Sequence, residues 1–388
     1  MRKPPKTLRF AILIWREELH SITSSSSTLL VILGGVVFYS LLYNLLYRPN
    51  VVRDAPIVVV DESQSHASRE LVERVDASPN ASIVGSVATL SDGYNLLAGK
   101  QAQAILYLPN NFAKQIGGAS RATLILLPST TSLLYYEATA GAVVEATLAL
   151  AEEYRASKMW LLPREVAIQL ADSPTPKLVG NVLFNPDKGY ADYLIPPVLL
   201  LIIFQTMTMA ITMIHGARVA AHTTPTRGLI GGYGVRAAEV ASRTLFYTAI
   251  YGLLALFLLA TIPQLFDLPH TAKPLTLIGF IVPFLIATSL FAQAFARLFR
   301  GSEDGLLFIT FFSVGLIFLS GISFPLQQIP QPWRLLHYLL PATVGTRAYV
   351  GIGTMGATLS DISPQLWLLV VQSVSYFLLA TITRKRGV

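Results

Sequence analysis

Polar side chains that could handle a substrate recur on one face of a long apolar stretch. Gln205, Thr208 and Thr212 lie within residues 194–215, at steps of three and four residues. This spacing places all three on one side of a helix, where their amide and hydroxyl groups can donate and accept hydrogen bonds. Two interpretations fit this face: it lines a substrate pathway, or it holds neighbouring helices together. The sequence leaves both open.

Groups that could catalyse a reaction or bind a metal are sparse. The acidic candidates stand at expected strand ends and helix starts, where such residues usually act as caps, and their spacing matches no metal-ligand set. The sequence has no zinc-protease motif and no serine–histidine–carboxylate arrangement that we can defend. We therefore expect no catalytic residue and no metal site. The candidates are Asp61, Glu62, His66, Asp76 and Asp92.

The elements that must position the polar face are apolar segments of membrane length. Six stretches lack Asp, Glu, Lys and Arg, and at about 1.5 Å per helical residue each can cross a hydrocarbon core of about 30 Å. The chain is 53% hydrophobic and only 13% charged, which lies outside the range of soluble proteins. We predict a polytopic α-helical membrane protein with six transmembrane helices, at 26–47, 194–215, 244–262, 275–296, 305–325 and 365–383.

The sequence shows neither an ion-coupling site nor an ATP-binding site that could drive transport. No ionisable residue lies in the middle of a predicted span, whereas ion-coupled transporters generally need carboxylates or histidines there. Gly99-Lys100 is followed by Gln101 rather than Ser or Thr, so it forms no phosphate-binding loop. Uphill transport by this chain would need a partner that supplies the energy.

The distribution of Lys and Arg predicts the orientation in the membrane. Fourteen lysines and arginines lie on the side of the two termini, against three in the short loops opposite. The more basic side is normally cytoplasmic, so both termini, including the tail 384–388, are expected in the cytoplasm. The net charge of +7 is explained by this topology, and we expect no nucleic-acid partner.

Residues 48–193, between the first two predicted spans, read as an inserted α/β domain outside the cytoplasm. Strand-like segments alternate with helix-like segments, which predicts a partly parallel sheet. We expect a docking or gating module rather than an enzyme. Strands are predicted at 56–61, 82–87, 102–109 and 122–128, and helices at 68–75, 90–97, 111–116 and 138–160.

Residues 1–25 should contain an amphipathic helix on the cytoplasmic side. Apolar residues recur at helical spacing, and such a stripe favours a helix lying in the membrane interface, with Trp15 at headgroup depth. A solvated lead-in to the first span is the alternative. The stripe consists of Leu8, Ile12, Trp15, Leu19 and Ile22.

Residues 326–350 should form a re-entrant region within the membrane domain 194–383. Prolines at 325, 330, 332 and 341 prevent one continuous spanning helix. Short helices dipping into the outer leaflet fit better, with their backbone shielded by protein. Trp333 and Tyr338 suit the membrane interface.

Several stretches in order resemble the permease subunits of type-2 ABC exporters, in the subgroup with a large extracytoplasmic domain after the first helix. The resemblance spans essentially the whole chain, and its order and spacing are more specific than any single stretch. The matching stretches are Pro56-Ile-Val-Val-Val-Asp61, Asp76-Ala-Ser-Pro79, Ala104 to Pro109 with Phe112, Phe184-Asn-Pro186 and Leu340-Pro-Ala-Thr343.

The resemblance implies partners and a cellular location. It implies a cytoplasmic ABC ATPase that carries ATP and Mg²⁺, so that this chain binds no cofactor itself, and a second permease copy or paralogue that completes a dimer. A periplasmic adaptor and an outer-membrane channel commonly accompany such permeases in Gram-negative bacteria. The implied location is the inner (cytoplasmic) membrane of a bacterial cell.

Contacts with the ATPase are implied at the N-terminal helix, with Arg16, and at a coupling loop, 216–243. The family's loop usually carries a charged stretch that ends in Gly-Thr. Here only Arg218, Arg227 and Gly228 are partial matches, and few carboxylates remain. Coupling then uses other contacts, or this subunit is the weaker half of a pair.

A transport permease is the leading hypothesis for the function. It would move lipophilic or amphiphilic substrates, such as drugs or lipids, out of the cytoplasm or the inner leaflet. A non-transporting membrane receptor or assembly scaffold, with an extracytoplasmic ligand-binding domain, is the alternative. An integral-membrane enzyme is disfavoured by the missing intramembrane His, Asp and Glu.

Overall fold

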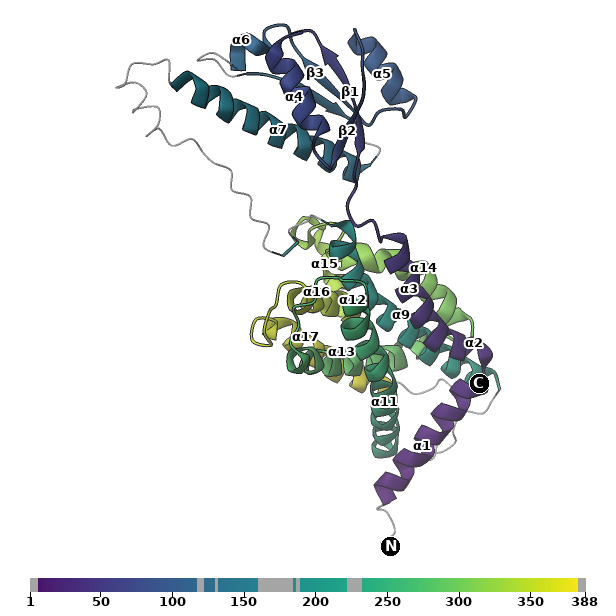
Figure 1. Cartoon of the computed structure of the whole chain (residues 1–388). Coiled ribbons are helices and arrows are strands. Elements are labelled where there is room, and N and C mark those ends of the chain that lie inside the picture. The colour runs from purple at the N-terminus through teal and green to yellow at the C-terminus, as the bar shows by residue number, and fades with distance from the viewer. Residues whose placement is uncertain are drawn as a thin grey trace. The chain divides into compact units, whose positions relative to one another are not determined.

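The computed structural model describes residues 6–116, 122–129, 132–159, 184–185, 189–221 and 232–382. The chain divides into two compact units, Val51–Asn181 and the remainder, Met1–Asn50 with Val182–Val388. We call them the α/β unit and the helical unit (Figure 1).

The α/β unit is built on a four-stranded sheet with the order β2-β1-β3-β4. Strands β1 (Ala55–Asp61), β2 (Ala81–Ser86) and β3 (Ala104–Leu108) are parallel, and β4 (Ile125–Pro128) pairs antiparallel with β3. The parallel strands are joined through helices α4 (His66–Asp76) and α5 (Leu90–Ala98). Helices α6 (Phe112–Ile116) and α7 (Leu133–Met159) follow β3 and β4.

Helices cover both faces of this sheet. Alternate side chains of β1 explain the arrangement: Ile57 and Val59 pack with α4 and α7, whereas Val58 and Val60 pack on the opposite face with α5. A central parallel strand buried on both faces needs a continuous apolar run, and the run Ile57 to Val60 supplies it.

The acidic residues of this unit serve local structure. Asp61 accepts hydrogen bonds from the backbone of Ser63 and Gln64 and from the Ser68 hydroxyl. Asp76 accepts one from the Ile83 backbone, and Asp92 lies at the start of α5, where it bonds the Thr89 cap. Among the described residues, no group of three or more His, Asp and Glu side chains is placed to hold a metal ion.

Within the described ranges, five helices are long and apolar enough to cross a membrane. They are Ser26–Leu46, α9 (Tyr190–Ala220), Tyr233–Leu265, Pro274–Leu298 and α17 (Ser363–Ile382). The first consists of α2 (Ser26–Leu29), η1 (Leu30–Gly35) and α3 (Val36–Leu46). The third consists of α11 (Tyr233–Leu256), η2 (Phe257–Thr261) and α12 (Ile262–Leu265), and the fourth of α13 (Pro274–Phe295) and η3 (Ala296–Leu298).

The predicted span 305–325 is shorter than expected. Its helix, α14, covers Asp304–Leu319, 16 residues. The chain then turns at Gly321, whose φ of +82° is a conformation that favours glycine. Hydropathy continues through Phe324, so composition alone could not locate this turn. The part of the chain that the structure describes therefore has five helices of spanning length, where we predicted six.

The predicted coupling loop 216–243 is mostly helix. Helix α9 continues to Ala220 and α11 begins at Tyr233, which leaves only residues 221–232 between them. Hydropathy falls where arginines appear, but arginine is a good helix former, so both helices extend past their apolar segments. Arg218 accordingly lies in a helix.

Helix α9 is the centre of the helical unit. It contacts α3, α11, α13, α14 and α16 (Pro341–Gly353), and most of its side chains are buried. Residues 326–350, predicted as a re-entrant region, fold as short helices, η4 (Leu326–Gln328), α15 (Gln331–Leu339) and α16, rather than as one continuous helix. Prolines lie at or next to the start of each.

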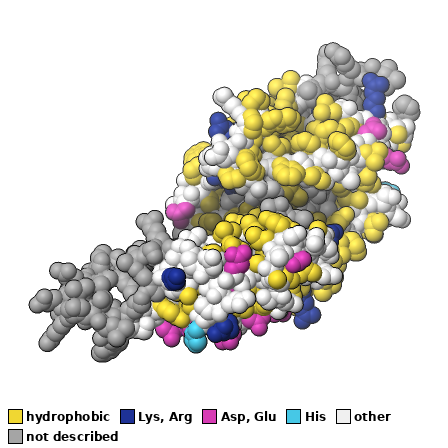
Figure 2. All heavy atoms as spheres, turned by 90° about the horizontal axis from the view of Figure 1, so that it is seen from above, with side chains coloured by type: hydrophobic (Ala, Val, Ile, Leu, Met, Phe, Trp, Pro, Cys, Tyr) yellow, Lys and Arg dark blue, Asp and Glu magenta, His cyan; other side chains and the backbone are white. Residues whose placement is uncertain are grey.

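Large apolar side chains remain exposed along the outer helices, and Figure 2 shows wide hydrophobic areas with charged side chains scattered between them. On α14 they form one face, led by Phe311 at 88% exposure, and α17 has a similar face around Trp367. Such faces suit lipid or a partner helix.

Candidate functional site

A buried carboxylate joins the N-terminal helix to the helical unit. Glu18 lies on α1 (Lys6–Thr23) and is only 1% exposed. Isoleucines one turn before and after it, Ile14 and Ile22, are also buried. This packed face differs from the stripe predicted from the sequence, in which Ile12 and Leu19 are about half exposed. The side chain of Leu8 lies outside the described residues.

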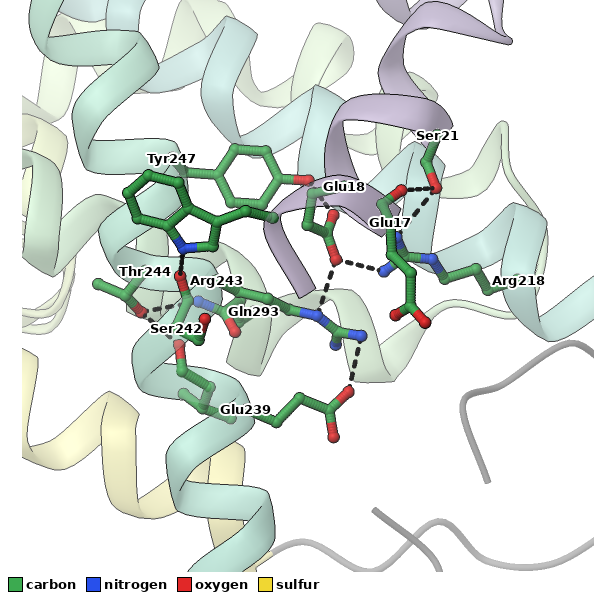
Figure 3. A network of polar contacts seen from close by, with 12 residues as sticks. Glu17, Glu18, Ser21, Arg218, Glu239, Ser242, Arg243, Thr244, Tyr247 and Gln293 are labelled. Carbon is green, nitrogen blue, oxygen red and sulfur yellow. Dashed lines mark hydrogen bonds and ion pairs between the residues drawn. The ribbon is translucent and has the colours of Figure 1, made fainter. Parts of the chain in front are cut away.

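Two arginines from different helices meet the Glu18 carboxylate (Figure 3). Arg218 Nη1, on the last turn of α9, donates to Glu18 Oε1 at 2.7 Å, and its Nη2 donates to Ser21 Oγ at 3.0 Å. Arg243 Nε, on α11, lies 2.8 Å from the same Glu18 oxygen in an ion pair that lacks hydrogen-bond alignment. We call Glu18, Arg218, Arg243 and Tyr247 the Glu18 cluster.

Tyr247 completes the cluster from α11. Its hydroxyl donates to Glu18 Oε2 at 2.7 Å, so both carboxylate oxygens have partners. Arg243 is also held by Glu239, one helical turn earlier, at 2.7 Å. Every charged group in the cluster is thus paired, which is the condition under which charges are tolerated in a protein interior.

The electrostatics of the cluster favour the ionised carboxylate. Burial alone would raise the pKa of Glu18, but the charges of Arg243 and Arg218 and the hydrogen bonds from Arg218 and Tyr247 hold it below the ordinary value of 4.5. Glu18 is therefore charged at neutral pH and holds α1 against α9 and α11 at the same time.

Trp15 adds a second attachment of α1. Its Nε1 donates to the Ser242 carbonyl oxygen at 3.1 Å, and its ring meets Phe246 edge-on at 5.9 Å between centroids. Trp15 was predicted at the membrane interface. It is 40% exposed, so one side of the indole packs on α11 while the other is open to the surroundings.

The predicted pathway residues separate into two environments. Thr208 and Thr212 are fully buried, and each donates its hydroxyl to a backbone carbonyl one turn earlier in α9. Thr212 also packs against Gly305 of α14, where an added Cβ would lie 2.4 Å from it. Both threonines serve helix packing in this structure. Gln205 is only partly buried and has surface left for a substrate or a second chain.

The predicted ATPase contacts also differ from one another. Arg16 is exposed on α1, whereas Arg218 is committed to Glu18. Arg227 and Gly228 lie outside the described residues. Of the predicted interface residues on α15, Trp333 is 59% and Tyr338 is 45% exposed, which suits side chains that meet lipid headgroups.

Sequence reasoning missed Glu18 as a functional residue. The predicted apolar stripe contained only hydrophobic residues, so the carboxylate of Glu18, between Ile14 and Ile22, was not included in it. A signal was present in the sequence, because Ile14, Glu18 and Ile22 follow one another at steps of four residues and therefore share one helix face. An acid on such an apolar face indicates a buried carboxylate that needs a partner. The arginines that it pairs with were counted only as topology signals.

Comparison with protein families gives one match. The model of the family described as "ABC-2 family transporter protein" matches residues 26–382. No curated protein matches the chain, and no solved structure does. Since the family match covers most of the chain and five helices have spanning length, the protein belongs to the ABC-2 transporter family, as a multi-pass membrane component of a transporter.

Proposed function

We propose that the chain is the permease of an ATP-driven exporter, which moves lipophilic or amphiphilic molecules out of the cytoplasm or the inner leaflet. The observation that carries this proposal is the family match over residues 26–382. Energy comes from a separate cytoplasmic ABC ATPase, which holds ATP and Mg²⁺. The permease itself binds no cofactor.

The proposed topology places both termini in the cytoplasm and the α/β unit outside it, in a bacterial inner membrane. Charge asymmetry supports this orientation. Helix α14 supplies the sixth crossing. At about 1.5 Å per residue its 16 residues extend about 24 Å, so the turn at residues 320–325 completes its path to the outer surface.

The Glu18 cluster is the proposed coupling junction. Residues 221–232 connect α9 to α11, and Glu18 binds an arginine on each of these helices. A force applied to α1 or to this connection reaches both helices at once. The ATPase contacts the exposed face of α1, including Arg16, and the connection, including Arg227 and Gly228. Arg218 acts inside the permease.

A second permease copy or paralogue is proposed to complete the transporter. The α14 face is rich in aromatic residues and suits a helix of the partner. Gln205, with part of its surface exposed beside the buried threonines, is the proposed pathway residue of α9. A periplasmic adaptor and an outer-membrane channel are proposed as further partners of the α/β unit.

Dye export by cells tests the proposal. Cells that produce the chain together with its ATPase should export lipophilic dyes, and cells that produce either protein alone should not. A photo-crosslinking residue at Arg16 should capture the ATPase, whereas one at Trp367, on α17, should not. Membrane insertion with no export across the dye panel, together with ligand binding by the α/β unit, would favour the receptor hypothesis.

A further inference from the structure

A cavity opens at the end of the helical unit where α9 begins. It has a volume of about 350 Å³ and is lined by Tyr193, by Arg347 and by the residues of the segment 321–327 other than Phe324. Volumes of this size are typical of small ligand sites. The Glu18 cluster contributes no residue to this cavity.

Arg347 is the charged group of the cavity. It lies in the middle of α16, where its neighbours Thr346 and Ala348 are fully buried, yet its own side chain is exposed. The structure gives it no ion pair with any residue that it describes, and the cavity lining contains no carboxylate. A guanidinium that has no anionic partner among the described residues is suited to bind an anionic ligand.

The rest of the lining combines polar and apolar groups. Ser323 and Gln327 are exposed and can donate hydrogen bonds. Ile322, Pro325 and the buried Leu326 supply apolar surface. The Tyr193 hydroxyl donates to the Ile322 carbonyl, so the turn that carries these groups is tied to α9.

We propose that this cavity binds an anionic phosphate group. The planar guanidinium of Arg347 matches two oxygens of a phosphate at once. Ser323 and Gln327 donate to the remaining oxygens, and the apolar lining contacts the first carbons of the attached chain. The phosphate comes from a lipid headgroup or from free phosphate, and both sources share this recognition. The site does not depend on the transport proposal.

Calorimetric titration of the purified full chain in detergent tests the site. The probes are dihexanoyl phosphatidic acid, dihexanoyl glycerol, which lacks the phosphate, and inorganic phosphate. Arg347→Gln should weaken phosphatidic acid binding by about tenfold or more, because a charged hydrogen-bonding partner is lost. Arg347→Lys should retain part of the affinity, since the charge remains without the fork. Arg334→Gln, a change of the same type on α15 outside the cavity lining, is the matched control.

Each outcome decides the proposal. Tighter binding of phosphatidic acid than of inorganic phosphate identifies a lipid headgroup, and equal binding identifies free phosphate as the ligand. The proposal is overturned if Arg347→Gln binds phosphatidic acid as the wild type does, or if Arg334→Gln loses as much affinity. It is also overturned if dihexanoyl glycerol, which has no phosphate, binds as tightly as phosphatidic acid in the wild type. The melting temperature of each variant checks that it folds. Arg347→Lys keeps the positive charge, so it shows whether charge alone is enough for binding.

Discussion

Glu18 and Arg218 are 200 residues apart in the chain, yet Arg218 Nη1 donates to Glu18 Oε1 over 2.7 Å. The contact fastens the N-terminal helix to the cytoplasmic end proposed for α9. Because Arg243 of α11 meets the same oxygen, one carboxylate holds three helices together.

Replacing Glu18 by Gln should destabilise the helical unit by about 3 kcal/mol, because two largely covered guanidinium groups would lose the buried carboxylate that they share. Glu303→Gln, a change of the same type at an exposed acid just before α14, should change stability by no more than about 0.5 kcal/mol. Denaturant unfolding of the purified protein in detergent measures both. Equal effects of the two substitutions would show that the cluster adds no stability.

The contribution of Glu18 should depend on pH only in acid. Its pKa in the folded protein lies below the ordinary value of 4.5, so the unfolded chain takes up the proton first as the pH falls. The stabilisation is then complete above about pH 4.5 and declines as the pH falls through the lower folded value. The difference in stability between wild type and Glu18→Gln, measured from pH 3.5 to 8, should be constant above pH 5. A difference that instead changes between pH 6 and 8 would refute this assignment.

Local patterns predicted much of this fold. The strand expected at 56–61 is present at Ala55–Asp61, because an apolar β-branched run is a local signal. The extent of α9 and α11 was underestimated, since hydropathy falls at Arg218 and Arg243 although the helices continue. The Glu18 cluster could not be predicted from periodicity, because its members meet only after three helices pack together.

The contact between α9 and α14 should tolerate no added methyl group at Gly305. A Cβ there would lie 2.4 Å from Thr212, so Gly305→Ala should cost about 1–3 kcal/mol through overpacking. Gly315→Ala, on the same helix, would meet its nearest atom, of Phe312, at 3.6 Å. That control should be neutral or stabilising by up to about 1 kcal/mol. Thermal unfolding in detergent compares the two, and an equally stable Gly305→Ala protein would contradict the packing described for α14.

Substitutions at the partly exposed Gln205 and at the buried Thr208 should have different effects on export. Gln205→Leu removes a donor and an acceptor from partly exposed surface, so we expect altered export of some dyes with unchanged stability. Thr208→Val keeps the shape of a buried side chain and removes a hydroxyl that bonds only its own helix, so export should persist. Wild-type export by Gln205→Leu across the dye panel would place the pathway elsewhere.

The central claim is that α1, α9 and α11 move together through the Glu18 cluster. The chain has no cysteine, and Ile12 and Ala241 are exposed on α1 and α11. Spin labels at Ile12→Cys and Ala241→Cys, in labelled permease diluted with an excess of unlabelled permease, therefore report the distance between these helices within one copy. Double electron–electron resonance on the complex with the ATPase should give one narrow distance, unchanged by ATP, and a broad distribution when Glu18→Gln is added. A distance that shifts with ATP in the protein with Glu18 intact, or an equally narrow one in Glu18→Gln, would contradict the claim.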